Sequence, residues 1–364
     1  MEIQKFLGGQ IEKALSFFAE SIPKRRPFRN LVFKGGGMRG AAYIGVLEVL
    51  DREGVLDQIE RVAGASSGAI TATLLSLRRD LAETLHLIET IDFSRVPQRK
   101  QEGNTTVVPL LSRKVDLSAL EGLSSEVESA NRLIRRYGWF SSEYVYHWMQ
   151  GVIARCCNGN GMASFADFRA YGYRDLYIVV SNLSRRRSEV FSAQLTPDVS
   201  VADAVRLSMS IPLFFEGLQF DGKRFGSGDY YVDGGVFDNY PIHIFDDLQF
   251  AQSSQHYHNG INWETLGCYL YPNRAEAHPY EPITGLMSYM KAVVSSLYNA
   301  HQVTALDLNL LNQMRTIKID DCGVDPTEFS LTREDNRYKC LVQSGREAAE
   351  AYLDGYNLSE LLAA

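Results

Sequence analysis

A short apolar stretch at residues 30–34 runs directly into the glycine loop G-G-G-M-R-G at residues 35–40. A helical pattern follows at residues 41–50. A strand, a glycine loop and a helix in this order form the first half of an α/β unit. A second unit comes next, because residues 59–63 supply a second strand and residues 67–77 again show a helical pattern. The two successive units predict an α/β fold.

The turn between the second strand and its helix reads G-x-S-x-G from Gly64 to Gly68, with Ser66 at its centre. In this motif a serine sits on a tight strand-to-helix turn with its hydroxyl exposed. Glycine on either side gives the backbone the room that such a sharp turn requires. By itself the pentapeptide fits an ordinary loop at least as well, because Gly and Ser are common in turns. Ser67 is a neighbouring hydroxyl, but the frame of the motif favours Ser66 as a nucleophile.

The glycine loop also matches G-x-G-x-x-G, from Gly35 to Gly40, a pattern that holds phosphates in dinucleotide-binding folds. The acidic residue expected about 20 positions later would be Glu53 or Asp57, and neither closes a second strand. Amides at the start of a helix can equally bind the oxyanion of a tetrahedral acyl intermediate. The loop alone leaves both interpretations open, and the serine on the next strand favours the oxyanion.

A third motif lies far downstream, where the strand predicted at residues 230–232 ends in Asp233, Gly234 and Gly235. A carboxylate there can act as a general base if it lies within hydrogen-bond distance of the serine hydroxyl. An Asp-Gly turn closed by the aspartate side chain is the common structural alternative. A Ser–His–Asp triad is the catalytic alternative, because several histidines follow Asp233 in the chain order of such triads. They are His243, His256, His258, His278 and His301.

Together, the three motifs resemble the patatin-like phospholipase family, which carries G-G-G-x-R-G, G-x-S-x-G and a distal D-G-G or D-G-A in this order. The segment A-V-R-L-S-M-S-I-P at residues 204–212 also resembles the family, as do Asn239 and Pro241 after the D-G-G. The resemblance extends over about residues 28–355.

The resemblance implies a three-layer α/β/α fold with a mixed central sheet and a Ser–Asp dyad. Ser66 would attack the ester carbonyl, and Asp233 would accept its proton directly. The implied oxyanion hole consists of four successive amides, those of Gly36, Gly37, Met38 and Arg39. The Arg39 side chain would brace this loop or reach a lipid head group.

The implied activity is hydrolysis of phospholipid or lysophospholipid acyl esters, of the phospholipase A or lysophospholipase type, through an acyl-enzyme. Neither a metal nor another cofactor is implied. Two alternatives stay open. One is a serine esterase or neutral-lipid lipase with a Ser–His–Asp triad, and the other is a nucleotide-binding protein that uses the loop from Gly35 to Gly40.

Composition narrows the possible partners. The formal net charge of -7 argues against nucleic-acid binding as the main function, because such domains are usually basic. No secretory signal and no membrane-spanning apolar run is evident, which predicts a cytoplasmic protein that contacts a membrane peripherally.

The five cysteines form no C-x-x-C pair, so we expect free thiols in a reducing compartment. No Cys/His cluster indicates a metal site, and Asp320 and Asp321 fit a solvated turn.

The predicted organisation has three parts. They are an N-terminal amphipathic helix with a basic linker (residues 1–27), a catalytic domain (28–355) and a C-terminal tail (356–364). The helix, predicted at residues 1–22, is expected to pack on the protein body or to lie on an anionic membrane. Apolar residues 107–111 and 211–220 fit an acyl channel or ordinary core equally well. Residues 251–263, rich in polar side chains, predict a surface loop. The oligomeric state is left open.

Overall fold

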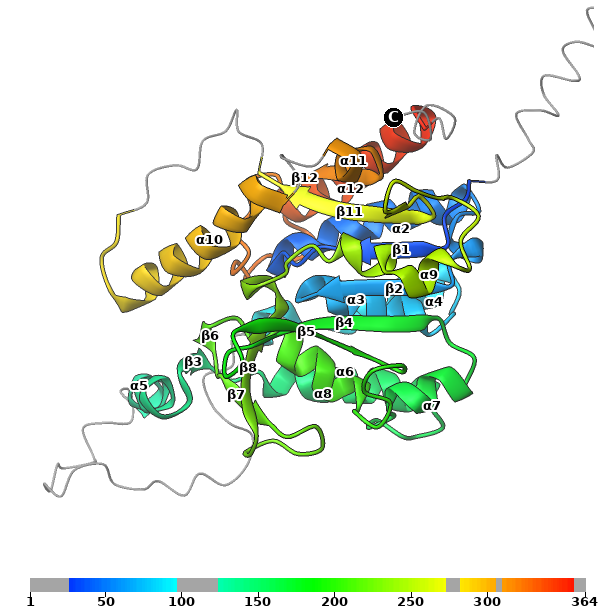
Figure 1. Cartoon of the computed structure of the whole chain (residues 1–364). Helices are drawn as coiled ribbons and strands as arrows, with labels where there is room; N and C mark the ends of the chain where they lie inside the picture. The colour runs from blue at the N-terminus through cyan, green and yellow to red at the C-terminus, as the bar shows by residue number, and fades with distance from the viewer. Residues whose placement is uncertain (1–25, 97–123, 273–281, 306–309, 357–364) are drawn as a thin grey trace, which may run out of the picture.

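The computed structural model describes residues 26–96, 124–272, 282–305 and 310–356. Within these ranges the protein is built on an eight-stranded sheet (Figure 1). Its strands are β1 (Asn30–Phe33), β2 (Arg61–Ala65), β4 (Asp175–Asn182), β5 (Arg187–Ser192), β7 (Leu218–Phe220), β8 (Asp229–Asp233), β11 (Thr265–Tyr271) and β12 (Thr316–Asp320). They lie in the order β12-β11-β1-β2-β4-β8-β7, and β5 pairs with β4.

The sheet is mixed, as predicted. Strands β12, β11, β1, β2 and β4 are parallel neighbours. Strands β5 and β8 pair antiparallel with β4, and β7 pairs antiparallel with β8. In open α/β sheets, ligand sites form where the carboxyl ends of parallel strands meet. Here the carboxyl ends of β1 and β2 lead into the glycine loop and into Ser66.

Most of the helices pack on one face of the sheet. The helices are α2 (Ala42–Arg52), α3 (Ser67–Ser76), α4 (Leu81–Glu89), α5 (Ser124–Arg136), α6 (Glu143–Cys156), α7 (Phe165–Ala170), α8 (Val201–Ser208), α9 (Leu248–Ala251), α10 (Leu286–Ala305), α11 (Leu310–Met314) and α12 (Asn336–Asp354). Alternate residues of β1 divide between two cores. Leu31 and Phe33 join the large core with α2, α3, α8 and α12, whereas Val32 faces a smaller core.

The layer on the other face is thin. It consists of the 3₁₀ turn η6 (Ile242–Asp246) and the short helix α9, which lies in front of the sheet in Figure 1. Phe245 and Phe250 from these elements pack on Val32, Ala63 and Tyr177 of the strands. The α/β prediction with a mixed sheet is therefore confirmed, with helices concentrated on one side.

Four further 3₁₀ turns and four short strands complete the described elements outside the sheet. The turns are η1 (Gly37–Ala41), η2 (Leu56–Gln58) and η3 (Phe93–Arg95), and a further turn, η5 (Gly234–Val236), follows β8. The short strands are β3 (Gly138–Phe140), β6 (Leu213–Phe215), β9 (Tyr257–His258) and β10 (Ile261–Asn262). The predicted surface loop at 251–263 is thus partly wrong, because it contains the β9–β10 hairpin and ends in the buried Trp263.

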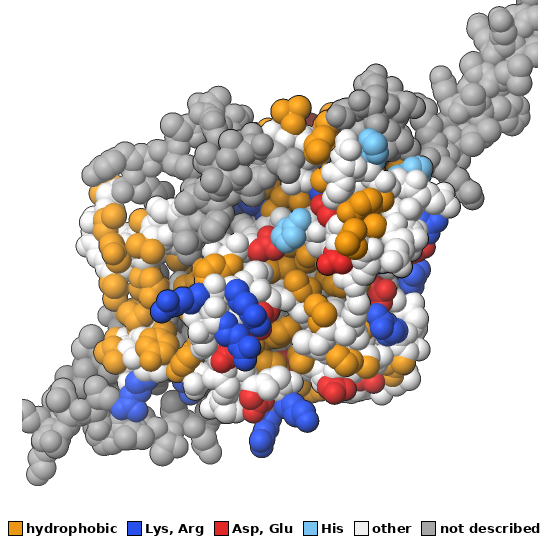
Figure 2. Space-filling view, viewed as in Figure 1, with side chains coloured by type: hydrophobic (Ala, Val, Ile, Leu, Met, Phe, Trp, Pro, Cys, Tyr) orange, Lys and Arg blue, Asp and Glu red, His pale blue; other side chains and the backbone are white. Residues whose placement is uncertain are grey.

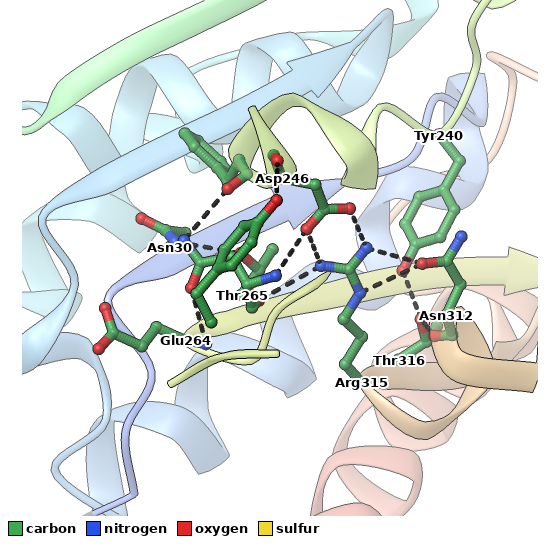
Figure 3. A network of polar contacts seen from close by, with 11 residues as sticks. Asn30, Tyr240, Asp246, Glu264, Thr265, Asn312, Arg315 and Thr316 are labelled. Atoms are coloured by element: carbon green, nitrogen blue, oxygen red, sulfur yellow. Dashed lines mark hydrogen bonds and ion pairs between the residues drawn. The ribbon is translucent and has the colours of Figure 1, made fainter. Parts of the chain in front are cut away.

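A buried polar network explains why this polar stretch folds inward (Figure 3). The Arg315 guanidinium is 0% exposed and donates to both carboxylate oxygens of Asp246, each at 2.6 Å. Asp246 also accepts from the Asn262 amide at 2.9 Å. Arg315 directly precedes β12, so the network holds η6 and the hairpin at the amino-terminal edge of the sheet, opposite the glycine loop.

The expectation of five free thiols is wrong for one pair. Cys322 and Cys340 form a disulfide, with their Cα atoms 6.3 Å apart. The bridge joins the loop after β12 to α12. Cys156, Cys157 and Cys268 have free thiols. The pair has no recognisable motif, and only the packing of α12 beside this loop brings the two side chains together.

Several predictions fall on segments outside the described residues or next to them. The helix at residues 1–22, the apolar segment 107–111 and residues 357–364 lie outside the described residues. Arg26, assigned to the basic linker, is buried and donates to the Leu353 carbonyl at 3.0 Å. Among the helices that the structure describes, none has both the length and the apolar character to cross a bilayer.

Candidate active site

Ser66 lies on the turn between β2 and α3, where the motif predicts it. Its backbone has φ 52° and ψ -126°, a conformation that a residue with a side chain keeps only when its surroundings hold it. A methyl group on Gly64 would lie 2.3 Å from the Gly68 carbonyl, and one on Gly68 would lie 2.3 Å from the Phe33 carbonyl oxygen. Close approach of the backbone therefore requires both glycines.

The two strands that end at Ser66 and Asp233, β2 and β8, both pair with β4. Strand β5 pairs along one edge of β4, so β2 and β8 share the other edge. Ala65, the last residue of β2, pairs with Val179, and Asp233, the last residue of β8, pairs with Val180. Two strands thus run toward each other along β4 and end at consecutive positions. Ser66 is 3% exposed and Asp233 is 0% exposed, so both lie in a largely water-free setting.

The Asp-Gly turn that was the structural alternative for Asp233 is also present. The Gly235 amide donates to Oδ1 of Asp233 at 2.7 Å. A methyl group on Gly234 would lie 2.3 Å from the Val179 carbonyl oxygen and 3.2 Å from Cβ of Ala65. The turn therefore presses directly against the end of β2, and its hydrogen bond orients the Asp233 carboxylate there.

The last residue of α8 and the segment after it support both candidates, through residues to which the sequence assigned no role. Ser208 Oγ accepts from the Ser66 amide at 2.9 Å and donates to the Val179 carbonyl at 2.6 Å. The Asp233 amide donates to the Ser210 carbonyl at 2.8 Å. Residues 204–212 entered the sequence argument only as a resemblance, and nothing in their spacing marks Ser208. The two hydrogen bonds of the Ser208 hydroxyl connect the strained turn at Ser66 to β4.

The four amides predicted for the oxyanion hole differ in their availability. Three of them already donate within the protein. They are Gly36 to Ser67 Oγ (3.0 Å), Met38 to the Pro326 carbonyl (3.0 Å) and Arg39 to the Gly36 carbonyl (3.2 Å). For the Gly37 amide we find no acceptor among the described residues. A phosphate cradle needs several free amides in succession, so this loop disfavours nucleotide binding.

Asn239 makes two hydrogen bonds to Gly35, the first residue of the glycine loop. Its carbonyl accepts from the Gly35 amide at 3.0 Å, and its Nδ2 donates to the Gly35 carbonyl at 3.2 Å. A methyl group on Gly35 would lie 2.2 Å from Oδ1 of Asn239 and 3.0 Å from Cβ of Ser66. One on Gly40 would lie 3.1 Å from Cβ of Ser67. Asn239, noted in the sequence only as a resemblance, thus links the D-G-G turn to the glycine loop.

Arg39 braces the loop from within. Its Nη1 lies 3.0 Å from Oδ2 of Asp321, and its Nε donates to the Val324 carbonyl at 2.6 Å. Burial lowers the pKa of the Arg39 guanidinium, and the carboxylates of Asp321 and Asp325 counteract this. Asp321 is fully buried, so the solvated-turn prediction is wrong for this residue. The sequence could not reveal the partner, which lies 282 positions away from Arg39 in the chain.

The described histidines that follow Asp233 belong to other elements than Ser66 and Asp233. The His243 side chain is exposed, with Nε2 3.7 Å from a carboxylate oxygen of Asp238. His256 and His258 belong to the β9–β10 region at the amino-terminal edge of the sheet, opposite Ser66. His278 and the His301 side chain lie outside what the structure describes. The geometry therefore favours the aspartate over a histidine as the partner of Ser66.

Replacing Gly37 by alanine is expected to lower kcat by at least about 100-fold, the effect of losing one oxyanion donor. Gly37 has φ +56°, and a Cβ there would lie 2.0 Å from the Pro326 carbonyl oxygen, so the loop must shift. Gly54→Ala is the matched control, because Gly54 has φ +67° with nothing within 4 Å of a Cβ. Ester hydrolysis and thermal unfolding should be measured for both variants. Equal activities would contradict the role of the Gly37 amide.

Comparisons with known proteins place the chain in a family. Residues 31–246 match the family model described as patatin-like phospholipase. YqhO of Bacillus subtilis (strain 168), an uncharacterized protein, is 26% identical over 328 residues, which cover 88% of this chain and 97% of YqhO. The probable lipid hydrolase 463L of Invertebrate iridescent virus 6 is 24% identical over 221 residues, which cover 61% of this chain and 64% of that protein.

A solved structure extends the likeness to the fold. VipD from Legionella pneumophila superposes with a TM-score of 0.53 at 18% sequence identity, covering 90% of this chain and 67% of VipD. The matched family region contains the glycine loop, the serine turn and the D-G-G turn. This chain belongs to the patatin-like phospholipase family.

Proposed function

We propose that this protein hydrolyses carboxylic ester bonds of phospholipids or lysophospholipids through a Ser66–Asp233 dyad. The observation that carries the proposal is the register along β4, with Ala65 opposite Val179 and Asp233 opposite Val180. Ser66 follows Ala65 directly, so the buried serine and the buried aspartate stand at adjacent strand ends. A general base needs this proximity before any other property.

In the acylation step, Ser66 Oγ attacks the ester carbonyl carbon while the Asp233 carboxylate accepts the hydroxyl proton. Negative charge then develops on the carbonyl oxygen. The Gly37 amide and the amides of Ser67 and Gly68 at the start of α3, which have no acceptor within the helix, would donate to this oxygen. The carbon–oxygen bond to the alcohol breaks, and the Asp233 proton passes to the departing alcohol or lysolipid.

Deacylation reverses these roles with water. The Asp233 carboxylate accepts a proton from the water molecule as its oxygen attacks the acyl-Ser66 carbonyl. The bond to Ser66 Oγ breaks, the fatty acid leaves, and the proton returns to the serine. A carboxylate is a weak base for a hydroxyl in water. Burial of both residues strengthens their interaction, because few water molecules compete there.

The surface near the site supports a lipid substrate and peripheral contact with a membrane. Helix α10 packs beside η5, the turn that follows Asp233, and exposes Leu286, Tyr289 and Val293 along one side. In Figure 2 apolar side chains gather at the left of the molecule, where α10 lies in Figure 1. Such an exposed apolar face is typical of contact with a membrane or another protein.

Labelling with a fluorophosphonate, followed by peptide mapping, tests the nucleophile. We expect the wild-type protein to be modified at Ser66 and Ser66→Ala to remain unlabelled. Ser67→Ala is the matched control and should still be labelled, because the Ser67 hydroxyl accepts a hydrogen bond from Gly36. Labelling that persists in Ser66→Ala and is lost in Ser67→Ala would contradict the proposal. Fatty-acid release from phosphatidylcholine, lysophosphatidylcholine and triacylglycerol then identifies the lipid class.

A further inference from the structure

The disulfide between Cys322 and Cys340 is accessible from the surface. Cys340 is exposed on α12 and Cys322 is half-buried, whereas Cys157 and Cys268 are buried free thiols. Disulfides that serve only stability are typical of small domains without a large core, and this chain has an extensive core. An external thiol can reach an exposed disulfide, and such bridges are the ones that are reduced and re-formed.

The bridge begins in a loop that supports the glycine loop. We call residues 321–326 the bracing loop. Its Pro326 carbonyl accepts from the Met38 amide at 3.0 Å, and two further residues of it contact the buried Arg39 guanidinium. A methyl group on Gly37 would lie 2.0 Å from the Pro326 carbonyl oxygen. The position of the Gly37 amide, the candidate oxyanion donor, therefore depends on the conformation of the bracing loop.

The backbone of the bracing loop has a conformation that its surroundings must hold. Cys322 has φ 50°, and Gly323 beside it has φ 64°. A residue with a side chain is uncommon at positive φ and keeps this conformation where neighbouring contacts fix it. The Cys322 amide donates to Oδ1 of Asp320 at 2.8 Å, and the disulfide fixes the side chain of the same residue. Reduction removes this covalent constraint from the loop.

Helix α12 holds the other end of the bridge firmly. A methyl group on Gly45 of α2 would lie 1.9 Å from the Val342 carbonyl oxygen of α12. One on Gly345 of α12 would lie 1.9 Å from the Ala42 carbonyl oxygen of α2. The backbones of the two helices are thus in close contact, and α2 directly follows the glycine loop. The disulfide consequently ties the bracing loop to a helix pair that is joined to the glycine loop.

We propose that Cys322 and Cys340 form a thiol–disulfide exchange site, at which an external dithiol lowers the activity of the candidate active site. The proposal rests on the proposed function and adds its control. A thiolate of the dithiol attacks the exposed Cys340 sulfur, and the electron pair of the broken S–S bond passes to the Cys322 sulfur, which takes up a proton. The second thiol of the dithiol then attacks the mixed disulfide and releases Cys340 as a thiol. The dithiol becomes a disulfide, and the protein gains two electrons and two protons.

Reduction should lower kcat for ester hydrolysis about tenfold. Relaxation of the bracing loop displaces the Gly37 amide, and complete loss of one oxyanion donor lowers kcat by about 100-fold or more. Reoxidation with oxidised glutathione should restore the activity. The double variant Cys322→Ser/Cys340→Ser should have the activity of the reduced protein and should not respond to a dithiol. Cys156→Ser, which removes a half-buried free thiol, is the control and should respond like the wild type.

The experiment treats the full chain with dithiothreitol and measures hydrolysis of nitrophenyl acetate, while alkylation and mass mapping report which cysteines are reduced. Hydrogen exchange of the peptide 35–42 is followed in the same samples, because the Met38 amide donates to the bracing loop. This exchange should become faster on reduction. The peptide 257–263, next to the Arg315–Asp246 network, is the reference and should exchange equally in both states.

An unchanged kcat with both cysteines of the bridge alkylated would overturn the exchange site and leave the proposed function standing. A bridge that dithiothreitol does not reduce in the folded protein would overturn it as well. If the oxidised protein is inactive and Ser66 is not labelled by a fluorophosphonate, the proposed function fails. Hydrogen exchange of the peptide 35–42 then decides by itself whether the bridge controls the glycine loop.

Discussion

Replacing Asp233 by asparagine is expected to lower kcat for ester hydrolysis by about 10³-fold, within the range for loss of a general base. The amide keeps the size of the side chain and its hydrogen bond to the Gly235 amide, so the fold should be preserved. It cannot accept the Ser66 proton. Steady-state kinetics on a soluble ester, with thermal unfolding alongside, measures both effects.

Asp238→Asn and His243→Ala are the matched controls for this prediction. Asp238 lies five positions after Asp233 in the chain. Nε2 of the exposed His243 ring lies 3.7 Å from Oδ2 of Asp238. Both variants should keep kcat within about twofold, because neither residue is at the end of β8. Full activity in Asp233→Asn together with inactivity in His243→Ala would replace the dyad by a triad.

Replacing Arg39 by methionine is expected to lower the free energy of unfolding by about 3–5 kcal/mol. The substitution leaves Asp321, which is fully buried, without the guanidinium that lies 3.0 Å away. It also removes the hydrogen bond to the Val324 carbonyl. Urea unfolding followed by circular dichroism measures the change. Activity should fall as well, because the loop that carries the Gly37 amide loses its support.

A double variant separates the charge from the packing. Arg39→Met combined with Asp321→Leu removes both charges, and replacement of a buried pair by apolar side chains often restores stability. Arg337→Met is the control, because the Arg337–Glu328 pair is half-exposed and should contribute less than about 1 kcal/mol. A loss in Arg39→Met no larger than in Arg337→Met would show that the buried pair does not stabilise the loop.

Local sequence patterns predicted the elements that carry the site. The apolar stretches around Val32 and Ala63 became strands, and the glycine loop and Ser66 lie at their carboxyl ends. These features depend on neighbouring residues in the chain, through alternation, helical spacing and the backbone freedom of glycine. The motif frame around Ser66 was informative for the same reason, because the tight turn is made by Gly64 and Gly68 themselves.

Local sequence patterns could not predict contacts between segments that lie far apart in the chain. Ser208 contacts Ser66 across 142 positions, and Asn239 contacts Gly35 across 204. The burial of Asp321 and the bridge from Cys322 to Cys340 likewise depend on how the segments pack. A serine, an asparagine or a cysteine fits a surface loop as well as a buried contact. Its role is therefore known only when its neighbours in space are known.

The sequence by itself determined that this chain forms an α/β fold with a serine on a tight turn after its second strand. Asp233 was named from the sequence only through the family resemblance, and the tertiary structure decided where its strand ends relative to that serine. Strands β2 and β8 share one edge of β4 and end opposite Val179 and Val180. Strand register is a property of pairing between segments far apart in the chain, so no local pattern specifies it. That register is what makes Asp233 the candidate partner of Ser66.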